Sequence, residues 1–397
     1  MERDNRMIPR GFRFSTAAAA IKRHGRKDLA LIVSEGEAVM SGMFTTNKVK
    51  AAPVRLDMRR IRSGKGRAII VNSGNANACT GKQGMRDAIE MTGLVAGSLG
   101  LKSNEVYPCS TGVIGRPLPM ERIRPKVIEL AGTVGGALIH DVAAAIMTTD
   151  TFPKTASKRV RIGNKTVTIA GVCKGAGMIC PHMATMLCFL LTDIRITPAA
   201  LDEALRQAVQ GSFNGITVDG DRSTNDTVLI MANGLAGNNV VTQGSSHFKT
   251  FTSALSTVAA ELSELIVRDG EGATKLVEVV VRRAKGKRDA ERAAFSIANS
   301  LLVKTALYGN DVNWGRIMAA LGYSGIALKE EMVDIYFGPV KVVNKGLATE
   351  REEEAAEFLR KKEVTITVDL HLGNDSARVL TCDLTEDYVR INAEYRT

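Results

Sequence analysis

The sequence predicts a protein that mixes α-helices with β-strands, of the α/β or α+β class. Short apolar runs bounded by Gly, Asn or Asp recur along the chain and indicate strands. Between them, longer segments place apolar residues three and four positions apart, which indicates helices. At 397 residues the chain exceeds the size at which one hydrophobic core normally stops growing, so we expect at least two packed lobes.

The first half of the chain alternates between the two patterns. Its apolar runs predict strands at 29–33, 68–71, 160–162 and 167–172. Its helical spacing predicts helices at 86–99, 119–131 and 138–147. A further apolar run at 186–191 directly follows a Gly-rich loop and predicts a buried strand.

The second half contains equally clear signals. A helix is predicted at 198–210, because Thr197 and Pro198 form a typical helix start and acidic residues follow in the first turn. Another helix is predicted at 252–265, and the charged segment 350–363 is typical of a solvated helix. Strands are predicted at 227–232, 275–281, 332–337 and, from strict alternation, 364–372.

Composition excludes several classes of protein. With 45% hydrophobic and 24% charged residues, the chain has the composition of a globular protein. No apolar run approaches the roughly 20 residues of a membrane-spanning helix, and the first residues lack the apolar stretch of a secretory signal. The six cysteines follow no paired spacing and predict neither a disulfide framework nor a metal site. We therefore expect a cytoplasmic protein with reduced thiols, no membrane association and no bound metal.

The net charge of +11 is unevenly distributed. Residues 1–184 carry 29 Lys and Arg against 13 Asp and Glu, whereas residues 185–397 carry 24 against 29. A basic half can bind nucleic acid, but these basic residues are scattered and no aromatic stacking motif lies among them. We expect no nucleic-acid partner, and a binding module built on the basic half remains only the third candidate function.

Four segments rich in Gly, Asn and Thr are not explained by packing alone. Any one of them could be a plain turn, but four together suggest backbone donors and small hydroxyls around a polar ligand. None has the spacing of a nucleotide-binding loop. The segments are NSGNANACTG at 72–81, CSTGVIG at 109–115, KGAGMICPHMATML at 174–187 and VDGDRSTNDT at 218–227.

The third segment suggests a particular chemistry at Thr185, which lies between the Gly-rich loop and the predicted strand. Such a Thr is usually an ordinary strand residue. Alternatively, the chain is cut before Thr185, which then becomes an N-terminal nucleophile whose own α-amino group serves as its base. An α-amine has a pKa of about 7.7–8.0, which suits general-base catalysis. None of the five His lies in a motif of the serine-hydrolase or zinc-protease type.

At these residues the sequence resembles the ornithine acetyltransferases of arginine biosynthesis, which are monofunctional or bifunctional. The resemblance spans essentially the whole chain, with eight motifs in family order. They are NSGNANACTG, STGVIG (110–115), AIMTTDTFPK (145–154), KGAGMICPHMATML, DGDRSTNDT (219–227), IVRDGEGATK (266–275), YGNDVNWGRI (308–317) and RINAEYRT (390–397).

The resemblance implies a fold and a processing step. The fold is an αββα sandwich like that of N-terminal-nucleophile hydrolases, with a smaller C-terminal lobe. The precursor cuts itself between Ala184 and Thr185, giving an α chain of residues 1–184 and a β chain of residues 185–397. Two copies of each chain are expected to form an α2β2 heterotetramer.

The resemblance also implies a role for individual residues. Thr185 takes the acetyl group of N-acetylornithine as an ester, releases ornithine and passes the acetyl group to glutamate in a ping-pong cycle. The oxyanion of each tetrahedral intermediate is held by the Thr111 hydroxyl and the Gly112 backbone N–H. The implied substrate contacts are Thr148, Lys174, Thr185, Glu271, Asn392 and Thr397.

Two questions remain open at this stage. The family needs no cofactor, but the motifs do not decide whether acetyl-CoA also serves as an acetyl donor and makes the enzyme bifunctional. The second candidate function is an aminopeptidase or amidase that uses the same nucleophile with water as the acceptor.

Overall fold

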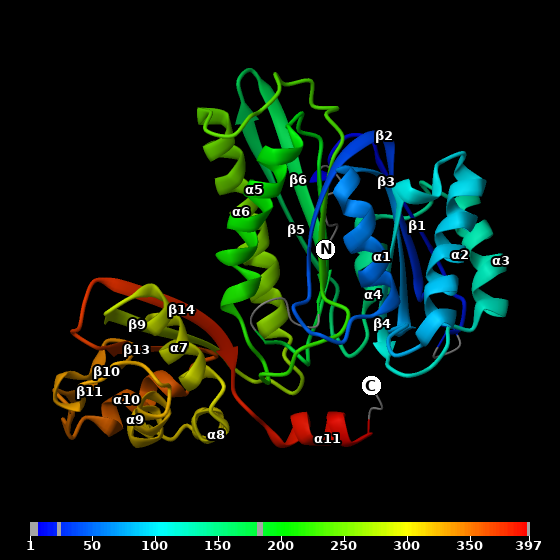
Figure 1. The fold of residues 1–397 in the computed structure, drawn as a ribbon. Coiled ribbons are helices and arrows are strands. Elements are labelled where there is room, and N and C mark those ends of the chain that lie inside the picture. The colour runs from blue at the N-terminus through cyan, green and yellow to red at the C-terminus, as the bar shows by residue number, and fades with distance from the viewer. Residues whose placement is uncertain (1–6, 22–24, 181–185, 395–397) are drawn as a thin grey trace.

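The computed structural model describes residues 7–21, 25–180 and 186–394, which form two lobes of different size (Figure 1). The larger lobe is built on an eight-stranded sheet and the smaller lobe on a six-stranded sheet. In the described ranges, no helix is both long and apolar enough to cross a membrane.

The sheet of the larger lobe is shared by segments from both sides of residue 185. Its order is β4-β3-β2-β8-β7-β6-β5, with β1 paired to β2. Strand β2 is unusually long and changes partner along its length, pairing β3 up to Val39 and β8 from Val39 to Phe44. The strands are β1 (Phe12–Ala17), β2 (Leu29–Phe44), β3 (Lys65–Asn75), β4 (Val106–Val113), β5 (Lys154–Ile162), β6 (Lys165–Lys174), β7 (Leu187–Thr192) and β8 (Thr227–Ala232).

Alternating side chains divide this sheet into two facing layers. Ile32 of β2 and Phe189 of β7 belong to one buried cluster, so the two halves of the sheet pack on each other. The neighbouring Leu31 packs outward with helices α2 and α3, whereas Leu190 packs outward with α5 and α6. The helices of this lobe are α1 (Ala52–Arg60), α2 (Gly81–Leu99), α3 (Met120–Gly132), α4 (Ile139–Ile146), α5 (Pro198–Gln210) and α6 (Ser246–Arg268). These layers confirm the expected αββα sandwich.

The smaller lobe is a separate core of mixed topology. Its sheet has the order β12-β11-β10-β13-β9-β14, and its helices pack their Ala and Ile residues on that sheet. The strands are β9 (Leu276–Ala284), β10 (Asp334–Phe337), β11 (Val340–Asn344), β12 (Leu347–Ala348), β13 (Glu363–Asp369) and β14 (Asp375–Cys382). The helices are α7 (Lys287–Ala298), α8 (Leu301–Tyr308), α9 (Trp314–Gly322) and α10 (Glu352–Leu359), and a last helix, α11 (Glu386–Glu394), follows β14 outside this core.

The lobes are joined by β14 and α11. Leu380 of β14 forms a parallel bridge with Ile216 and is buried in the core of the larger lobe. Helix α11 then leads back toward the larger lobe (Figure 1), where the Tyr388 hydroxyl donates to Asp219 Oδ2 at 3.3 Å. Tyr388 of α11 is therefore held against the loop that contains Asp219.

Most predicted elements lie inside observed ones, and the differences have local causes. The prediction at 198–210 coincides with α5, whose Thr197 hydroxyl accepts from the Ala200 N–H. The strand predicted at 364–372 ends earlier, at Asp369, because His371 adopts a positive φ of 52° that is incompatible with a strand. The strand predicted at 332–337 begins later, at Asp334, after a turn of 3-10 helix.

Candidate active site

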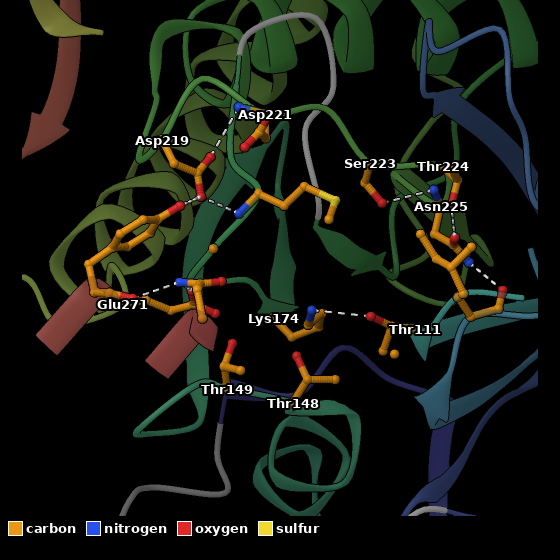
Figure 2. A pocket seen from close by; sticks show the side chains of 17 residues that line it. Thr111, Thr148, Thr149, Lys174, Asp219, Asp221, Ser223, Thr224, Asn225 and Glu271 are labelled. Carbon is orange, nitrogen blue, oxygen red and sulfur yellow. Dashed lines mark hydrogen bonds between the residues drawn. The ribbon is translucent and has the colours of Figure 1, made fainter. Parts of the chain in front are cut away.

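A pocket lies where the ends of several strands and loops meet (Figure 2). Six residues implied by the family resemblance line it together, although they come from five distant parts of the chain. They are Thr111, Gly112, Thr148, Lys174, Glu271 and Asn392. The other three implied residues, Ala184, Thr185 and Thr397, lie outside the described residues. The roles of all nine remain predictions.

Position 112 requires a glycine, both for its backbone conformation and for the close approach of neighbouring atoms. It lies near the end of β4 with a φ of 131°, a conformation that residues with a side chain rarely adopt. A Cβ atom there would lie 2.3 Å from the carbonyl carbon of Gly74 and 2.5 Å from the nitrogen of Asn75. Only glycine lets β4 run this close to β3 and line the pocket with backbone.

Among the described residues that line the pocket, Lys174 is the one with a basic side chain. It is 3% exposed at the end of β6, and its Nζ donates to Thr111 Oγ1 at 3.2 Å (Figure 2). Burial lowers the pKa of Lys174, while the nearby Asp150 carboxylate opposes that shift. A charged Lys has donors but no acceptor, so Thr111 must accept this bond and its own hydroxyl hydrogen stays available to a ligand.

A buried group of three charges lies behind the pocket. Lys154 Nζ bonds Asp150 Oδ1 at 2.7 Å and Asp269 Oδ2 at 2.5 Å, and the side chains of all three are at most 2% exposed. Burial alone would raise the pKa of Asp150, but Lys174 and Lys154 hold it at about 2. Because this pKa is lowered, the stability that Asp150 contributes is fully present above its usual value of 3.8 and is lost as the pH falls toward about 2.

The same charges fix the backbone of the pocket. Asp150 accepts from the backbone N–H of Thr148 at 2.9 Å and from that of Gly175 at 2.7 Å. Asp269 accepts from the backbone N–H of Thr151 at 3.0 Å. The triad of Asp150, Lys154 and Asp269 therefore ties together the loop after α4, the end of β6 and the loop after α6.

The opposite side of the pocket is acidic. Glu271 Oε2 accepts from Asn392 Nδ2 at 2.8 Å, and the Glu271 N–H donates to the Ala176 carbonyl oxygen at 2.9 Å. Gly177 makes room for this carboxylate, since a Cβ on it would lie 2.4 Å from the Glu271 carboxyl group. The pocket thus carries a positive charge at Lys174 and a negative charge at Glu271.

Sequence reasoning missed several residues of the pocket. Asp219, Asp221, Ser223, Thr224 and Asn225 lie in the segment 218–227, which was predicted as a whole to face a polar ligand. Thr149 was within reach of prediction, since it lies in the TTDT motif beside Thr148. Tyr388 carried no signal, because α11 reaches the pocket only through tertiary contacts.

The four polar segments do not contribute equally. Three of them line the pocket, but 72–81 contributes only Ala76 and mainly satisfies backbone groups. Asn72, for example, donates to the Asn75 carbonyl oxygen at 2.8 Å and accepts from the Ser110 hydroxyl at 2.6 Å. For this segment, a packing role explains the polar residues better than a ligand does.

Comparison with known proteins identifies the family of this chain. A sequence model of the ArgJ family matches residues 13–397. The chain belongs to the ArgJ family. It is 56% identical over 393 residues to the arginine biosynthesis bifunctional protein ArgJ of Geobacter sulfurreducens, covering 98% of this chain and 100% of that one. Its identity to the protein of the same name from Symbiobacterium thermophilum is 51% over 395 residues, covering 98% of each chain.

A solved structure supports the same assignment. The arginine biosynthesis bifunctional protein ArgJ of Bacillus halodurans is 46% identical, with a TM-score of 0.51, and the match covers 52% of this chain and 98% of that chain. Family membership makes this chain an enzyme, a transferase of arginine biosynthesis, and confirms the resemblance carried by its eight motifs.

The buried triad generates a stability prediction. Lys154→Met removes the ammonium group that bridges two buried carboxylates, so it should lower the free energy of unfolding by about 3–5 kcal/mol. Urea unfolding at neutral pH measures this change. Lys158→Met on the same strand is the control, since its ammonium forms a solvent-exposed hydrogen bond to the neutral Thr257 hydroxyl. It should change stability by about 0.5 kcal/mol or less. Equal losses in the two variants would contradict the role given to the triad.

Proposed function

We propose that this ArgJ-family chain moves an acetyl group from N2-acetylornithine to glutamate, through an acetyl ester on Thr185. The observation that carries this proposal is the register of β6 and β7. Lys174 is paired opposite Leu187, so the chain enters β7 beside the Lys174 ammonium of the pocket. Leu187 is two positions after the predicted nucleophile in the sequence, which supports a role for Thr185 in this pocket.

The first half-reaction would use the pocket as follows. The Thr185 hydroxyl attacks the acetyl carbon of N-acetylornithine while its α-amine takes the hydroxyl proton. The negative oxygen of the tetrahedral intermediate is stabilised by the Thr111 hydroxyl and the Gly112 N–H. The bond between the acetyl carbon and the ornithine nitrogen then breaks, the proton passes to that nitrogen, and ornithine leaves.

The second half-reaction is the reverse with another amine. The α-amino group of glutamate attacks the acetyl carbon of the ester and loses a proton to the α-amine of Thr185. The bond between the acetyl carbon and the Thr185 oxygen then breaks, the proton passes to that oxygen, and N-acetylglutamate leaves. Both substrates carry a carboxylate on the carbon that bears the reacting nitrogen. Lys174 suits that carboxylate and Glu271 suits an ammonium group, with Asn392, Thr148 and Thr397 as further predicted contacts.

Self-cleavage between Ala184 and Thr185 would create the α-amine that this chemistry needs. The lengths of related chains support this proposal. The ArgJ relatives match this chain over at least 98% of their own length. The solved Bacillus halodurans chain also matches over 98% of its own length, but it covers only 52% of this chain. A chain of about half length is expected if the precursor is cut near its middle. The α chain 1–184 and the β chain 185–397 follow from this proposal.

Further expectations concern cofactors, the second acetyl donor, the cellular location and the assembly of the protein. The proposed cycle needs no cofactor, because the acetyl group passes from one amino acid to another through the protein. The relatives are called bifunctional, which favours acetyl-CoA as a second acetyl donor. We also propose a cytoplasmic location and an α2β2 assembly, without nucleic-acid or membrane partners.

Processing is tested on a denaturing gel. The purified protein should separate into pieces of roughly 20 and 23 kDa, scaled by length from 42.6 kDa. Thr185→Ala should remain one chain, because no hydroxyl is left to attack the Ala184 carbonyl carbon. Thr192→Ala, at the far end of β7, is the control and should still be cut. A single intact band from the parent protein would contradict the mechanism.

The transfer itself is tested by following the acetyl group. With N-acetylornithine and glutamate, we expect N-acetylglutamate and ornithine in equal amounts, and almost no product when glutamate is omitted. Release of free acetate without glutamate would instead indicate the hydrolase alternative. N-acetylglutamate made from acetyl-CoA and glutamate would establish the second donor.

The oxyanion pair generates a kinetic prediction. Thr111→Val keeps the shape of the side chain but removes one donor, so kcat should fall by about 100- to 1,000-fold with little change in KM. Thr111→Ser should retain most activity because it keeps the hydroxyl group. Both variants must be assayed after the gel shows complete cleavage, since cleavage also passes through an oxyanion. Parental turnover by cut Thr111→Val would leave Thr111 as a structural residue.

A further inference from the structure

Helix α11 brings two polar side chains to the acidic side of the pocket. Tyr388 and Asn392 both line the pocket and are four positions apart, so they lie on the same face of the helix. Each donates to a carboxylate: Asn392 Nδ2 to Glu271 Oε2 at 2.8 Å, and the Tyr388 hydroxyl to Asp219 Oδ2 at 3.3 Å. The proposed function gives a role to Glu271 and Asn392 but none to Tyr388.

The proposed cycle makes opposite demands on this side of the pocket. Both substrates bring an α-carboxylate to Lys174 and a reacting nitrogen to Thr111, so their side chains extend toward Asp219 and Glu271, which lie away from Thr111 (Figure 2). The side chain of ornithine ends in an ammonium nitrogen and that of glutamate in carboxylate oxygens, the same number of bonds from Cα. One place must therefore bind a group that only donates hydrogen bonds and then a group that only accepts them.

Glu271 and Asn392 meet only the first demand. The Glu271 carboxylate attracts an ammonium group but repels a carboxylate. Asn392 has two amide hydrogens, and both are already used, one by Glu271 Oε2 and the other by the Tyr388 carbonyl oxygen at 3.0 Å. The side-chain carboxylate of glutamate needs another donor.

The Tyr388 hydroxyl meets both demands, because a hydroxyl group donates and accepts. We propose that Tyr388 is a specificity-determining residue that lets one pocket take both substrates. Its oxygen accepts from the side-chain ammonium of N-acetylornithine while its hydrogen stays on Asp219, and the same hydrogen turns to the side-chain carboxylate of glutamate. This inference rests on the proposed function, since only that cycle brings both side chains to one place.

The contacts of Asp219 permit this change of partner. Its Oδ2 also accepts from the Met178 N–H at 2.5 Å, and its Oδ1 accepts from the N–H groups of Ile179 at 2.9 Å and Asp221 at 3.1 Å. The bond from Tyr388, at 3.3 Å, is the longest of the four. Both oxygens of Asp219 thus remain hydrogen-bonded when the Tyr388 hydrogen turns away.

The electrostatic surroundings keep a hydrogen on the Tyr388 oxygen. Burial raises the pKa of Tyr388, and the nearby carboxylates of Asp219 and Glu271 raise it further. The hydroxyl group is therefore neutral at working pH and has a hydrogen to donate to glutamate.

Tyr388→Phe tests the inference, because it removes the hydroxyl group and keeps the ring. On fully cut enzyme, isotope exchange follows each half-reaction alone: labelled ornithine enters N-acetylornithine without glutamate, and labelled glutamate enters N-acetylglutamate without ornithine. We expect glutamate exchange to slow by about 10-fold or more relative to ornithine exchange, because the carboxylate loses a charged hydrogen bond whereas the ammonium keeps Glu271.

Tyr336→Phe is the matched control. The Tyr336 hydroxyl donates to Asp334 Oδ2 at 3.4 Å in the smaller lobe, so this variant loses a bond of the same kind away from the pocket. It should leave the ratio of the two exchange rates as it is in the parent. An equal slowing of both exchanges in Tyr388→Phe would indicate that Tyr388 only supports the loop of Asp219, and would overturn the inference. Parental rates of both exchanges would overturn it as well.

Glu271→Gln is expected to shift the same ratio the other way. The neutral amide no longer attracts the ammonium of ornithine and no longer repels the carboxylate of glutamate, so ornithine exchange should slow more than glutamate exchange. A shift in the same direction in Glu271→Gln and Tyr388→Phe would contradict the separate roles given to the two side chains.

The parent protein decides on the proposed function. If it exchanges neither label, the proposed function fails and the inference fails with it. If it exchanges both labels and Tyr388→Phe leaves their ratio unchanged, only the role of Tyr388 fails.

Discussion

The pocket depends on one buried ammonium group placed between two carboxylates. Removing three charges from water is costly, and their mutual attraction offsets that cost only when the remaining hydrogen bonds are made as well. Here Asp150 and Asp269 use their other acceptor sites on backbone N–H groups of Thr148, Gly175 and Thr151. The buried charges are thus stabilised only when these three segments are in place. The same hydrogen bonds hold the three segments together around the pocket.

The fold explains how a chain could be cut in its middle and remain one structure. Strand β7 pairs with β6 on one side and with β8 on the other, and β8 pairs with the long strand β2. A break before Thr185 would therefore leave the second chain in the centre of the sheet. Phe189 and Leu190 of β7 bury their side chains on opposite faces of that layer. The sandwich would hold the two chains together without a covalent link.

The sequence predicts well those elements whose bounds are set by residues close to them in the chain. Helix α5 is predicted at its observed bounds because Thr197 and Pro198 mark its start, and β8 because Gly and Asn bound an apolar run. Strand β2 extends to Phe44, far beyond the predicted 29–33, because its continuation past the polar residues 34–37 depends on pairing with β8. The pocket shows the same limit: motifs identify Thr111 and Lys174, whereas Tyr388 and the charge on Asp150 acquire meaning only through distant partners.

The segment 218–227 shows how one loop can serve two strands. Asn225 donates to the Ser110 carbonyl oxygen at 2.8 Å, next to the proposed oxyanion residue Thr111. The following residue, Asp226, accepts from Met186, next to the proposed nucleophile. Two consecutive residues directly before β8 therefore bond β4 and the residue that leads into β7. A reaction that needs its nucleophile and its oxyanion donors in fixed register is well served by setting both from a single short segment, because any movement of that segment shifts the two together.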